Sequence, residues 1–193
     1  LIVEHDNLAS PRFASNPPDR CYYCKKKGFA ELFSIARTYG IKVVADGLNA
    51  DDLRDYRPGR RAGEEMGVLS PLKEAGLTKI DIRSLSRRLN LPTAEKPANP
   101  CLATRFPYGT EITPEGLRRV KAAEEALLKM NIPLVRVRHH GNLARIEVPP
   151  ECLAGIVENA GRLVSIFKEI GYVYVTLDLQ GYRTGSMNEA LER

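Results

Sequence analysis

The chain has 193 residues, of which 43% are hydrophobic, enough for one good-sized domain or two small ones with a buried core. Its 29 Lys and Arg residues are interspersed with 24 Asp and Glu residues, and the net charge of +5 suits a phosphate on a small ligand as well as nucleic acid. No apolar run is long enough to cross a bilayer, and no charged-then-apolar leader is visible. We therefore expect a folded cytoplasmic protein without a membrane partner.

The first 110 residues predict part of a doubly wound α/β domain. Helix, apolar strand and polar loop follow one another in the order typical of a parallel sheet, whose ligands bind at the carboxyl ends of the strands. The expected elements are a Pro-rich loop over residues 10–19, a helix over 22–39 ended by Gly40, a strand over 41–45, a polar loop over 46–52 and a helix over 80–89.

The rest of the chain predicts a small α+β domain. Its expected elements are a helix from Thr113 to Met130, a hairpin of strands 134–139 and 143–148, a helix that starts at residues 149–151 and ends at Gly171, and a strand over 172–177. We therefore predict two domains, residues 1–110 and 111–193.

Cys21, Cys24 and Cys101 lie among cationic residues, a setting that favours thiolate chemistry over core packing. Their pattern allows a dithiol redox pair, a zinc site, or an iron–sulfur cluster with three cysteine ligands and one open iron. The Pro-rich loop before Cys21 is unlike a thioredoxin motif. Zinc would need Cys152 as a fourth ligand, but Cys152 falls in the first turn of an apolar helix and is predicted to pack there.

Arginines mark a second candidate site. Arg136 and Arg138 alternate along an expected strand and so project from one face, Arg145 lies across the hairpin, and Arg183 follows the last strand. Such arginines favour bidentate binding of phosphate or carboxylate, although a solvated sheet face gives the same pattern.

Two polar segments allow both a functional and a structural interpretation. In the loop that starts at Gly47, Asn49, Asp51 and Asp52 suit a nucleotide ribose or a Mg²⁺ ion, and equally a loop that caps the next helix. The pair at residues 139–140 has no third histidine at ligand spacing, which favours a polar hairpin end over a metal site.

Five ordered segments, which together span nearly the whole chain, resemble the LarE sulfur transferases of the PP-loop ATP pyrophosphatase superfamily. The segments are Asn16-Pro17-Pro18-Asp19-Arg20-Cys21-Tyr22-Tyr23-Cys24-Lys25, Asp46-Gly47-Leu48-Asn49-Ala50-Asp51-Asp52, Arg57-Pro58-Gly59, Pro100-Cys101-Leu102-Ala103-Thr104-Arg105-Phe106-Pro107-Tyr108-Gly109 and Gly181-Tyr182-Arg183-Thr184-Gly185-Ser186-Met187-Asn188.

The resemblance implies an enzyme that helps build the nickel-pincer nucleotide cofactor of lactate racemase. Such enzymes use ATP to adenylate a carboxylate of pyridinium-3,5-biscarboxylic acid mononucleotide and then replace AMP with sulfur. The sulfur comes either from a single cysteine, which becomes dehydroalanine, or from a 4Fe-4S cluster on three cysteines whose open iron carries an extra sulfide. The implied roles are cluster ligands for Cys21, Cys24 and Cys101, the AMP and Mg²⁺ side for Gly47, Asn49 and Asp52, and the substrate phosphate for Arg136, Arg138 and Arg183.

The resemblance also implies a hexamer built through the C-terminal domain. One family feature is missing: the chain lacks the Ser-Gly-Gly-x-Asp-Ser phosphate loop, and because Leu1-Ile2-Val3 resembles an interrupted strand we expect that loop upstream. Two other functions stay open. A tRNA-thiolating enzyme would need a basic RNA-binding surface, which the absence of Lys/Arg blocks disfavours, and a non-enzymatic module would use the cysteines for structural zinc.

Overall fold

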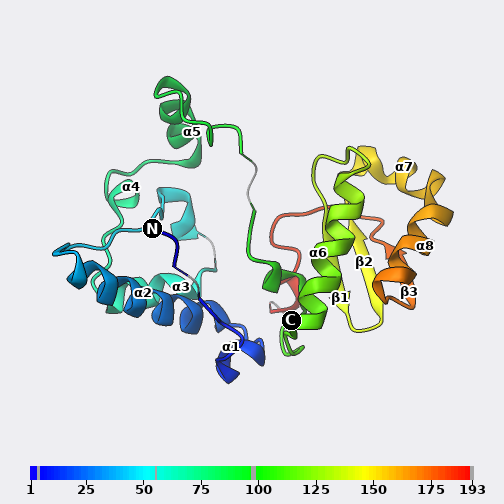
Figure 1. Ribbon diagram of the computed structural model, residues 1–193. Coiled ribbons are helices and arrows are strands. Elements are labelled where there is room, and N and C mark those ends of the chain that lie inside the picture. Colours follow the sequence, from blue (N-terminus) through cyan, green and yellow to red (C-terminus); the bar gives the residue numbers. More distant parts are fainter. Residues whose placement is uncertain (4, 55, 97–98, 192–193) are drawn as a thin grey trace. The chain divides into compact units, whose positions relative to one another are not determined.

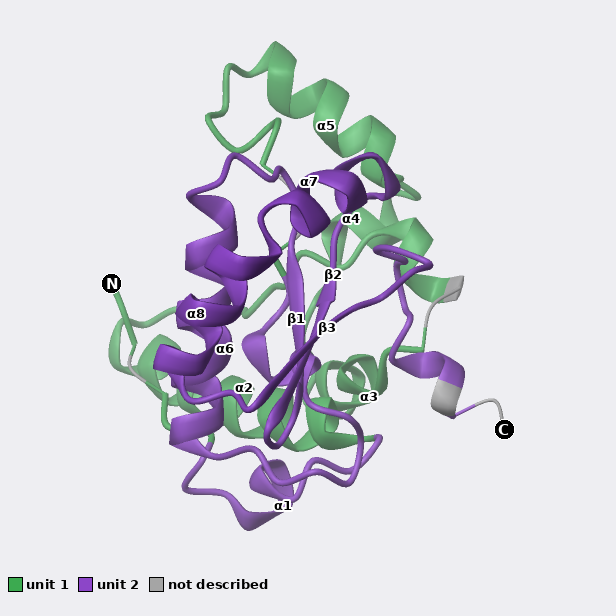
Figure 2. Cartoon of the chain, turned by 90° about the vertical axis from the view of Figure 1, so that its right-hand side faces the viewer, with its two compact units in different colours: residues 1–7, 19–99 green, residues 8–18, 100–193 purple. Residues whose placement is uncertain are grey.

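The computed structural model describes residues 1–3, 5–54, 56–96 and 99–191. The chain forms two compact units, one of residues 1–7 and 19–99 and one of residues 8–18 and 100–193 (Figure 2). The class is mixed α/β, as the sequence indicates, with its three-stranded sheet in the second unit. No helix of the described residues is long and apolar enough to span a bilayer.

The first unit is built around two packed helices, α2 (Arg20–Thr38) and α3 (Pro58–Glu65) (Figure 1). Gly63 of α3 lies against the Phe29 ring of α2, where a Cβ would be 3.5 Å from the ring. Gly40, at φ +67°, follows the end of α2 as predicted. The remaining helical elements of the unit are η1 (Ala50–Arg54), α4 (Pro71–Glu74) and α5 (Lys79–Arg88), the last within a residue of its expected bounds.

The strand expected over residues 41–45 is wrong in its length. Among the described residues this segment forms only one parallel bridge, between Ala45 and Leu69, with an amide bond from Asp46 N to Leu69 O of 2.8 Å. The side chains of Ile41 and Val43 are 56% and 53% exposed. With no further strand alongside in the described unit, these apolar side chains stay about half exposed and the pairing stops at the bridge.

The second unit places helices on one face of a three-stranded sheet. Strand β1 (Arg136–His140) pairs antiparallel with β2 (Leu143–Glu147), and β2 pairs parallel with β3 (Tyr174–Leu177), so the predicted hairpin and final strand are confirmed. Gly141, at φ +64°, opens the two-residue turn between β1 and β2. The helical elements are α1 (Pro11–Ala14), η2 (Leu102–Arg105), α6 (Pro114–Leu128), η3 (Pro150–Cys152), α7 (Leu153–Glu158), α8 (Ala160–Ile170) and η4 (Asn188–Ala190).

One of these helices starts as the sequence predicts, and the helix expected up to Gly171 is split in two. Helix α6 starts as predicted, with Pro114 in its first turn and the Thr113 hydroxyl accepting from Gly116 N at 3.0 Å. The single helix expected up to Gly171 is instead broken at Asn159, which caps both α7 and α8. The break turns the chain so that α7 and α8 both reach the core.

The sheet has one apolar and one charged face. The register pairs Arg136 with Glu147 and Arg138 with Arg145, and the intervening pair of Val137 and Ile146 points to the opposite side. That opposite side carries the core of the unit, to which α6, α7 and α8 contribute. Its most buried members include Ala123, Leu127, Val137, Ala144, Ile146, Leu163 and Phe167.

Candidate functional site

Cys21 lies in the first turn of α2 and Cys24 at the start of the second. They are three residues apart, so both thiols lie on the same side of the helix; Cys21 is exposed and Cys24 is half-buried. Gly59 in the first turn of α3 packs against the start of α2, where a Cβ would lie 3.3 Å from Cys21 O and 3.0 Å from Lys25 Cγ. A glycine at this position therefore lets α3 approach the backbone that carries the two cysteines.

A polar cluster next to the two cysteines joins α2 to α3. The Tyr22 hydroxyl donates to Glu65 Oε2 at 2.6 Å, and Lys26 Nζ lies 2.8 Å from that hydroxyl and 3.2 Å from Glu65 Oε2. The Arg61 guanidinium stacks over the Tyr22 ring, 4.1 Å from its centroid. The hydrogen bond from Tyr22 lowers the pKa of Glu65, so this carboxylate stays charged beside the two cations.

Cys101 lies in the second unit, in a loop whose backbone carbonyls are bound by a buried arginine. The side chain of Arg105 is completely buried, and its Nη1 donates to Pro100 O at 3.0 Å, to Cys101 O at 3.3 Å and to Thr104 Oγ1 at 2.9 Å. Its Nε and Nη2 donate to the two carboxylate oxygens of Glu124, at 2.8 and 2.9 Å. The thiol of Cys101 is exposed while its backbone is fixed by a buried ion pair.

The charged face of the sheet is tied to the same loop. Arg138 donates through Nη1 to Thr104 O at 3.0 Å and through Nη2 to Glu147 Oε2 at 2.6 Å and Ser186 Oγ at 2.9 Å. Its Nε is buried and makes no hydrogen bond within the described part of the chain. This guanidinium therefore links the Cys101 loop, the sheet and the C-terminal segment.

Three of the four arginines predicted from the sequence, Arg138, Arg145 and Arg183, belong to one continuous network. Arg145 Nη2 donates to Glu147 Oε1 at 3.0 Å, and its Nε lies 3.6 Å from Asp178 Oδ2. Arg183 Nη1 lies 3.6 Å from the other oxygen of Asp178. Because Glu147 also accepts from Arg138, the three arginines alternate with two carboxylates across the face.

Arg136 and Arg183 have different surroundings. Arg136 is buried, donates to Val135 O at 2.7 Å and places its guanidinium 5.5 Å from the Tyr182 ring centroid; burial, followed by the nearby charge of Arg105, lowers its pKa. Arg183 presents the fork of Nε and Nη2 to the two Glu189 oxygens, at 3.2 and 3.4 Å. The fork of Arg183 thus already binds a planar anion in the way predicted for a ligand.

The loop of Gly47, Asn49 and Asp52 lies in the first unit, at the end of the bridged segment. Asn49 Oδ1 accepts from Asp51 N at 3.0 Å, and Asp52 Oδ2 accepts from Asn49 N at 3.1 Å. Asp52 Oδ1 forms an ion pair with Arg57 at 2.9 Å. Both side chains are therefore used in shaping the loop, which agrees with the structural interpretation of this motif.

His139 corrects the expectation of a polar pair at the hairpin end. The side chain of His140 is exposed, but His139 is buried on the core side, where its Nδ1 lies 3.0 Å from the Tyr172 hydroxyl and its ring packs on Phe106. Burial lowers the pKa of His139. Cys152 is half-buried and packs against the core, as the sequence predicts.

The site residues divide between the units. Cys21, Cys24, Gly47, Asn49 and Asp52 belong to the first unit, and Cys101, Arg136, Arg138 and Arg183 to the second. Within the described residues no cluster of three or more His, Cys, Asp or Glu side chains is arranged to hold a metal ion. Pro97, one of two prolines predicted to stiffen the Cys101 loop, lies outside the described residues.

Sequence reasoning missed Glu124 and undervalued Arg105. In the sequence Arg105 is simply one of the cationic residues near Cys101. The signal for Glu124 is its position in α6, four residues after Val120 and three before Leu127, both of which are completely buried. A carboxylate in a buried helical stripe requires a cationic or hydrogen-bonding partner, so the pattern predicts one.

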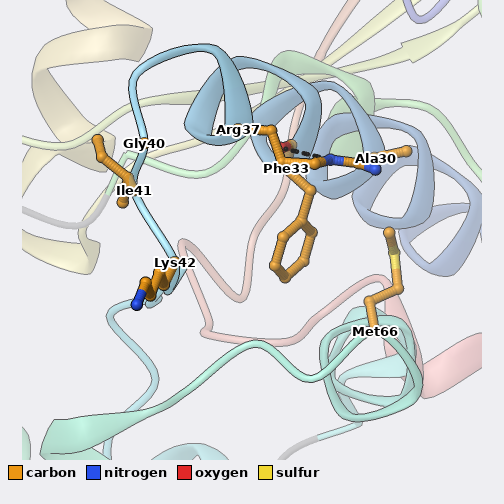
Figure 3. A pocket seen from close by; sticks show the side chains of 7 residues that line it. All are labelled: Ala30, Phe33, Arg37, Gly40, Ile41, Lys42 and Met66. Carbon is orange, nitrogen blue, oxygen red and sulfur yellow. Dashed lines mark hydrogen bonds between the residues drawn. The ribbon is translucent and has the colours of Figure 1, made fainter.

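A pocket of ≈ 740 Å³ lies elsewhere in the first unit (Figure 3). It is lined by residues from the second half of α2, from the segment that follows this helix and from the end of α3. None of the predicted site residues borders it. The lining residues are Ala30, Phe33, Arg37, Gly40, Ile41, Lys42 and Met66.

The chain is similar to three proteins over most of its length, and no protein-family model matches it. It is 39% identical over 188 residues to the pyridinium-3,5-bisthiocarboxylic acid mononucleotide synthase of Lactiplantibacillus plantarum, covering 97% of this chain and 68% of that protein. It is 46% identical over 194 residues to an uncharacterized protein of Synechocystis, covering 100% of the chain and 72% of that protein. An uncharacterized protein of Methanocaldococcus jannaschii is 36% identical over 173 residues, covering 90% of the chain and 68% of that protein.

Proposed function

The chain belongs to the LarE family of sulfur transferases, and from this premise we propose that it is an ATP-dependent pyridinium-3,5-bisthiocarboxylic acid mononucleotide synthase. The observation that carries the proposal is the 39% identity to such a synthase over 97% of the chain. The substrate would be a small mononucleotide. ATP would adenylate a carboxylate of this substrate with release of pyrophosphate, and sulfur would then displace AMP to leave a thiocarboxylate.

We propose that Cys21, Cys24 and Cys101 hold the 4Fe-4S cluster that delivers the sulfur. When bound, the cluster supplies an open iron that carries a transferable sulfide. The donor set fits this group: three thiols, two of them on one side of a helical turn, with Cys21 and Cys101 exposed to solvent. None of the four cysteines is tied up in a disulfide.

Short chain segments that lead to all three cysteines support the proposal that they bind one cluster. Asn16, in the left-handed region at φ 54°, donates through Nδ2 to Phe106 O and Pro107 O at 3.3 and 2.7 Å. Phe106 and Pro107 follow Cys101 by five and six residues, and Cys21 follows Asn16 by five. The segment that leads into the first two cysteines thus starts from the loop that carries the third.

Arg136, Arg138 and Arg183 would hold the phosphate of the mononucleotide. Two features support this role: Arg138 and Arg183 share one network of ion pairs, and the fork of Arg183 already accommodates a carboxylate of the chain itself. A bound phosphate would replace the Glu189 carboxylate on that fork, since both are anions that accept two parallel N–H bonds. The substrate would thereby be oriented with respect to the Cys101 loop, which Arg138 contacts directly.

We propose that Gly47, Asn49 and Asp52 lie on the AMP side of a PP-loop domain. Their position after the bridged segment agrees with ligand binding at the carboxyl end of a parallel strand. Direct binding of Mg²⁺ by Asp52 does not fit, because its two oxygens accept from Asn49 N and pair with Arg57. We therefore assign no step to a metal ion at this carboxylate. By family resemblance we propose a hexamer built through the C-terminal domain, residues 111–193.

The proposal is tested on the anaerobically purified full-length protein given ATP and pyridinium-3,5-biscarboxylic acid mononucleotide. We expect pyrophosphate release, a thiocarboxylate product by mass spectrometry, and iron with acid-labile sulfide in the protein. Replacing Cys21, Cys24 or Cys101 by Ala should abolish catalytic sulfur transfer. The matched control is Cys152→Ser, which should leave transfer intact because Cys152 packs against the core of the second unit.

Three results would contradict parts of the proposal. Zinc without iron or sulfide would rule out the cluster. Conversion of Cys101 to dehydroalanine, seen as a mass loss in its peptide after one turnover, would show that the cysteine gives up its own sulfur. Thiolation of tRNA in place of the mononucleotide would show the wrong substrate class.

A further inference from the structure

Cys101 combines an exposed thiol with an immobilised backbone. Its carbonyl oxygen accepts from Thr104 N at 2.9 Å, from Thr104 Oγ1 at 2.8 Å and from Arg105 Nη1 at 3.3 Å, and the preceding carbonyl of Pro100 also accepts from Arg105. Fixing the peptide planes on both sides of Cys101 fixes the direction of its Cα–Cβ bond. The sulfur is then restricted to a few positions set by the side-chain rotamers.

The orientation of Arg105 depends on Glu124. The carboxylate binds the Nε and Nη2 side of the guanidinium with two parallel bonds, which turns Nη1 toward the Cys101 loop. Glu124 is itself fixed, because its Oε1 also accepts from Val137 N of β1 at 2.9 Å. The chain of contacts therefore runs from the sheet through Glu124 and Arg105 to the carbonyls that flank Cys101.

We propose that Glu124 is a positioning residue for sulfur transfer, acting through Arg105 on the backbone of Cys101. The inference rests on the proposed role of Cys101 in delivering sulfur. An apolar pair could fill the space of Arg105 and Glu124 but could not hold the loop carbonyls, so the ion pair does more than pack. The carboxylate touches neither substrate nor sulfur. It keeps the third thiol at one place relative to the arginines that would bind the substrate.

Two variants separate positioning from folding. Glu124→Gln keeps an acceptor for Val137 N but loses the charged, bidentate interaction with Arg105. The double variant Arg105→Met with Glu124→Gln removes one charge of each sign, so no unpaired buried charge remains and the fold is retained even if the single variant is too unstable to study. The matched control is Glu115→Gln, a substitution of the same type in the same helix, at an exposed carboxylate that pairs with Arg119 at 2.6 Å.

Hydrogen exchange measures the loop without any need for activity. In both variants we expect the Thr104 amide, which bonds to Cys101 O, to exchange about tenfold faster or more, since its acceptor is no longer fixed. The amides of the β1 and β2 core should exchange as in the wild type in the double variant. The Glu115→Gln control should match the wild type throughout.

Sulfur transfer supplies the second readout. Misplacing a reacting group by about 1 Å can cost about a hundredfold in rate, so we expect kcat to fall by about tenfold to a hundredfold in both variants. The KM for the mononucleotide should stay within about threefold of the wild-type value, because the predicted phosphate-binding arginines are unchanged. A merely structural role would return kcat to the wild-type value in the charge-balanced double variant.

Wild-type exchange at Thr104 together with wild-type kcat in Glu124→Gln would overturn the inference, as would restored kcat in the double variant. Failure of the proposed function itself would give a different result. The wild-type protein would then transfer no sulfur to the mononucleotide, while the exchange experiment would still report whether Glu124 holds the loop.

Discussion

The two cysteine-bearing segments are held in opposite ways. Cys21 and Cys24 belong to a regular helix, and the polar contacts beside them, between Lys26 and Glu65, lie at the surface, where both side chains are about half exposed. Cys101 lies in an irregular loop whose contacts converge on Arg105, a completely buried cation. A helix needs no side chains to fix its backbone, whereas a loop without regular hydrogen bonds does.

The difference predicts unequal sensitivity to substitution. Surface ion pairs contribute little because water and salt screen them, but breaking a buried pair leaves one charge without a partner in a poorly solvated site. We therefore expect the Cys101 loop to be far more sensitive to single substitutions than the turn that carries Cys21 and Cys24.

Arg105→Met should cost about 3–5 kcal/mol in the free energy of unfolding, because it leaves the Glu124 carboxylate buried without its cation. Urea denaturation followed by circular dichroism measures this loss. Lys26→Met, which removes one partner of an exposed pair beside Cys24, is the matched comparison and should leave the urea midpoint nearly unchanged. Equal losses in the two variants would remove the proposed contrast.

Gly116→Ala should destabilise the second unit by about 1–3 kcal/mol through overpacking. A Cβ at this position in α6 would lie 2.8 Å from the ring of Phe106, which is buried just after the Cys101 loop. The same denaturation experiment applies, with Gly161→Ala of α8 as the control because nothing lies within 4 Å of its added Cβ. An unchanged midpoint for Gly116→Ala would mean that Phe106 can move aside at no cost.

Tyr22→Phe should have a smaller effect than either substitution. It keeps the buried ring, over which Arg61 stacks, and removes only the hydroxyl that donates to Glu65 Oε2 at 2.6 Å. A decrease in the urea midpoint that shrinks at high salt would agree with a partly exposed, charge-assisted bond. A loss as large as that of Arg105→Met would show that the first unit also depends on a single polar contact.

Acid should weaken the second unit through His139. Burial lowers its pKa from the ordinary value of 6.5, so in the folded protein the ring stays neutral while the same group in the unfolded chain takes up a proton. Its contribution is therefore complete above about pH 6.5 and is lost as the pH falls toward the folded pKa. The slope of stability against pH between neutral and pH 5 should decrease in His139→Gln. Equal slopes in the wild type and His139→Gln would contradict this assignment.

Local pattern was enough to predict most elements of the second unit. Some signals act within a few residues, so their structural effect can be predicted from the sequence. They are Pro114 after the capping Thr113, the turn at Gly141 and Gly171 at a helix end. The strand over residues 41–45 was not predictable in this way, because a strand is stabilised by its neighbours and only Leu69 pairs with it among the described residues.

The sequence by itself determined the family, the three cysteines that set the candidate chemistry and the alternation that puts Arg136 and Arg138 on one face. Only the tertiary structure decided how these groups are held. Glu124 and Arg105 are 19 residues apart, and Arg138 and Ser186 are 48 apart, so no local pattern pairs them. Which donor meets which acceptor in a buried network depends on how helices and strands pack, and that packing places the charged face of the sheet beside the Cys101 loop.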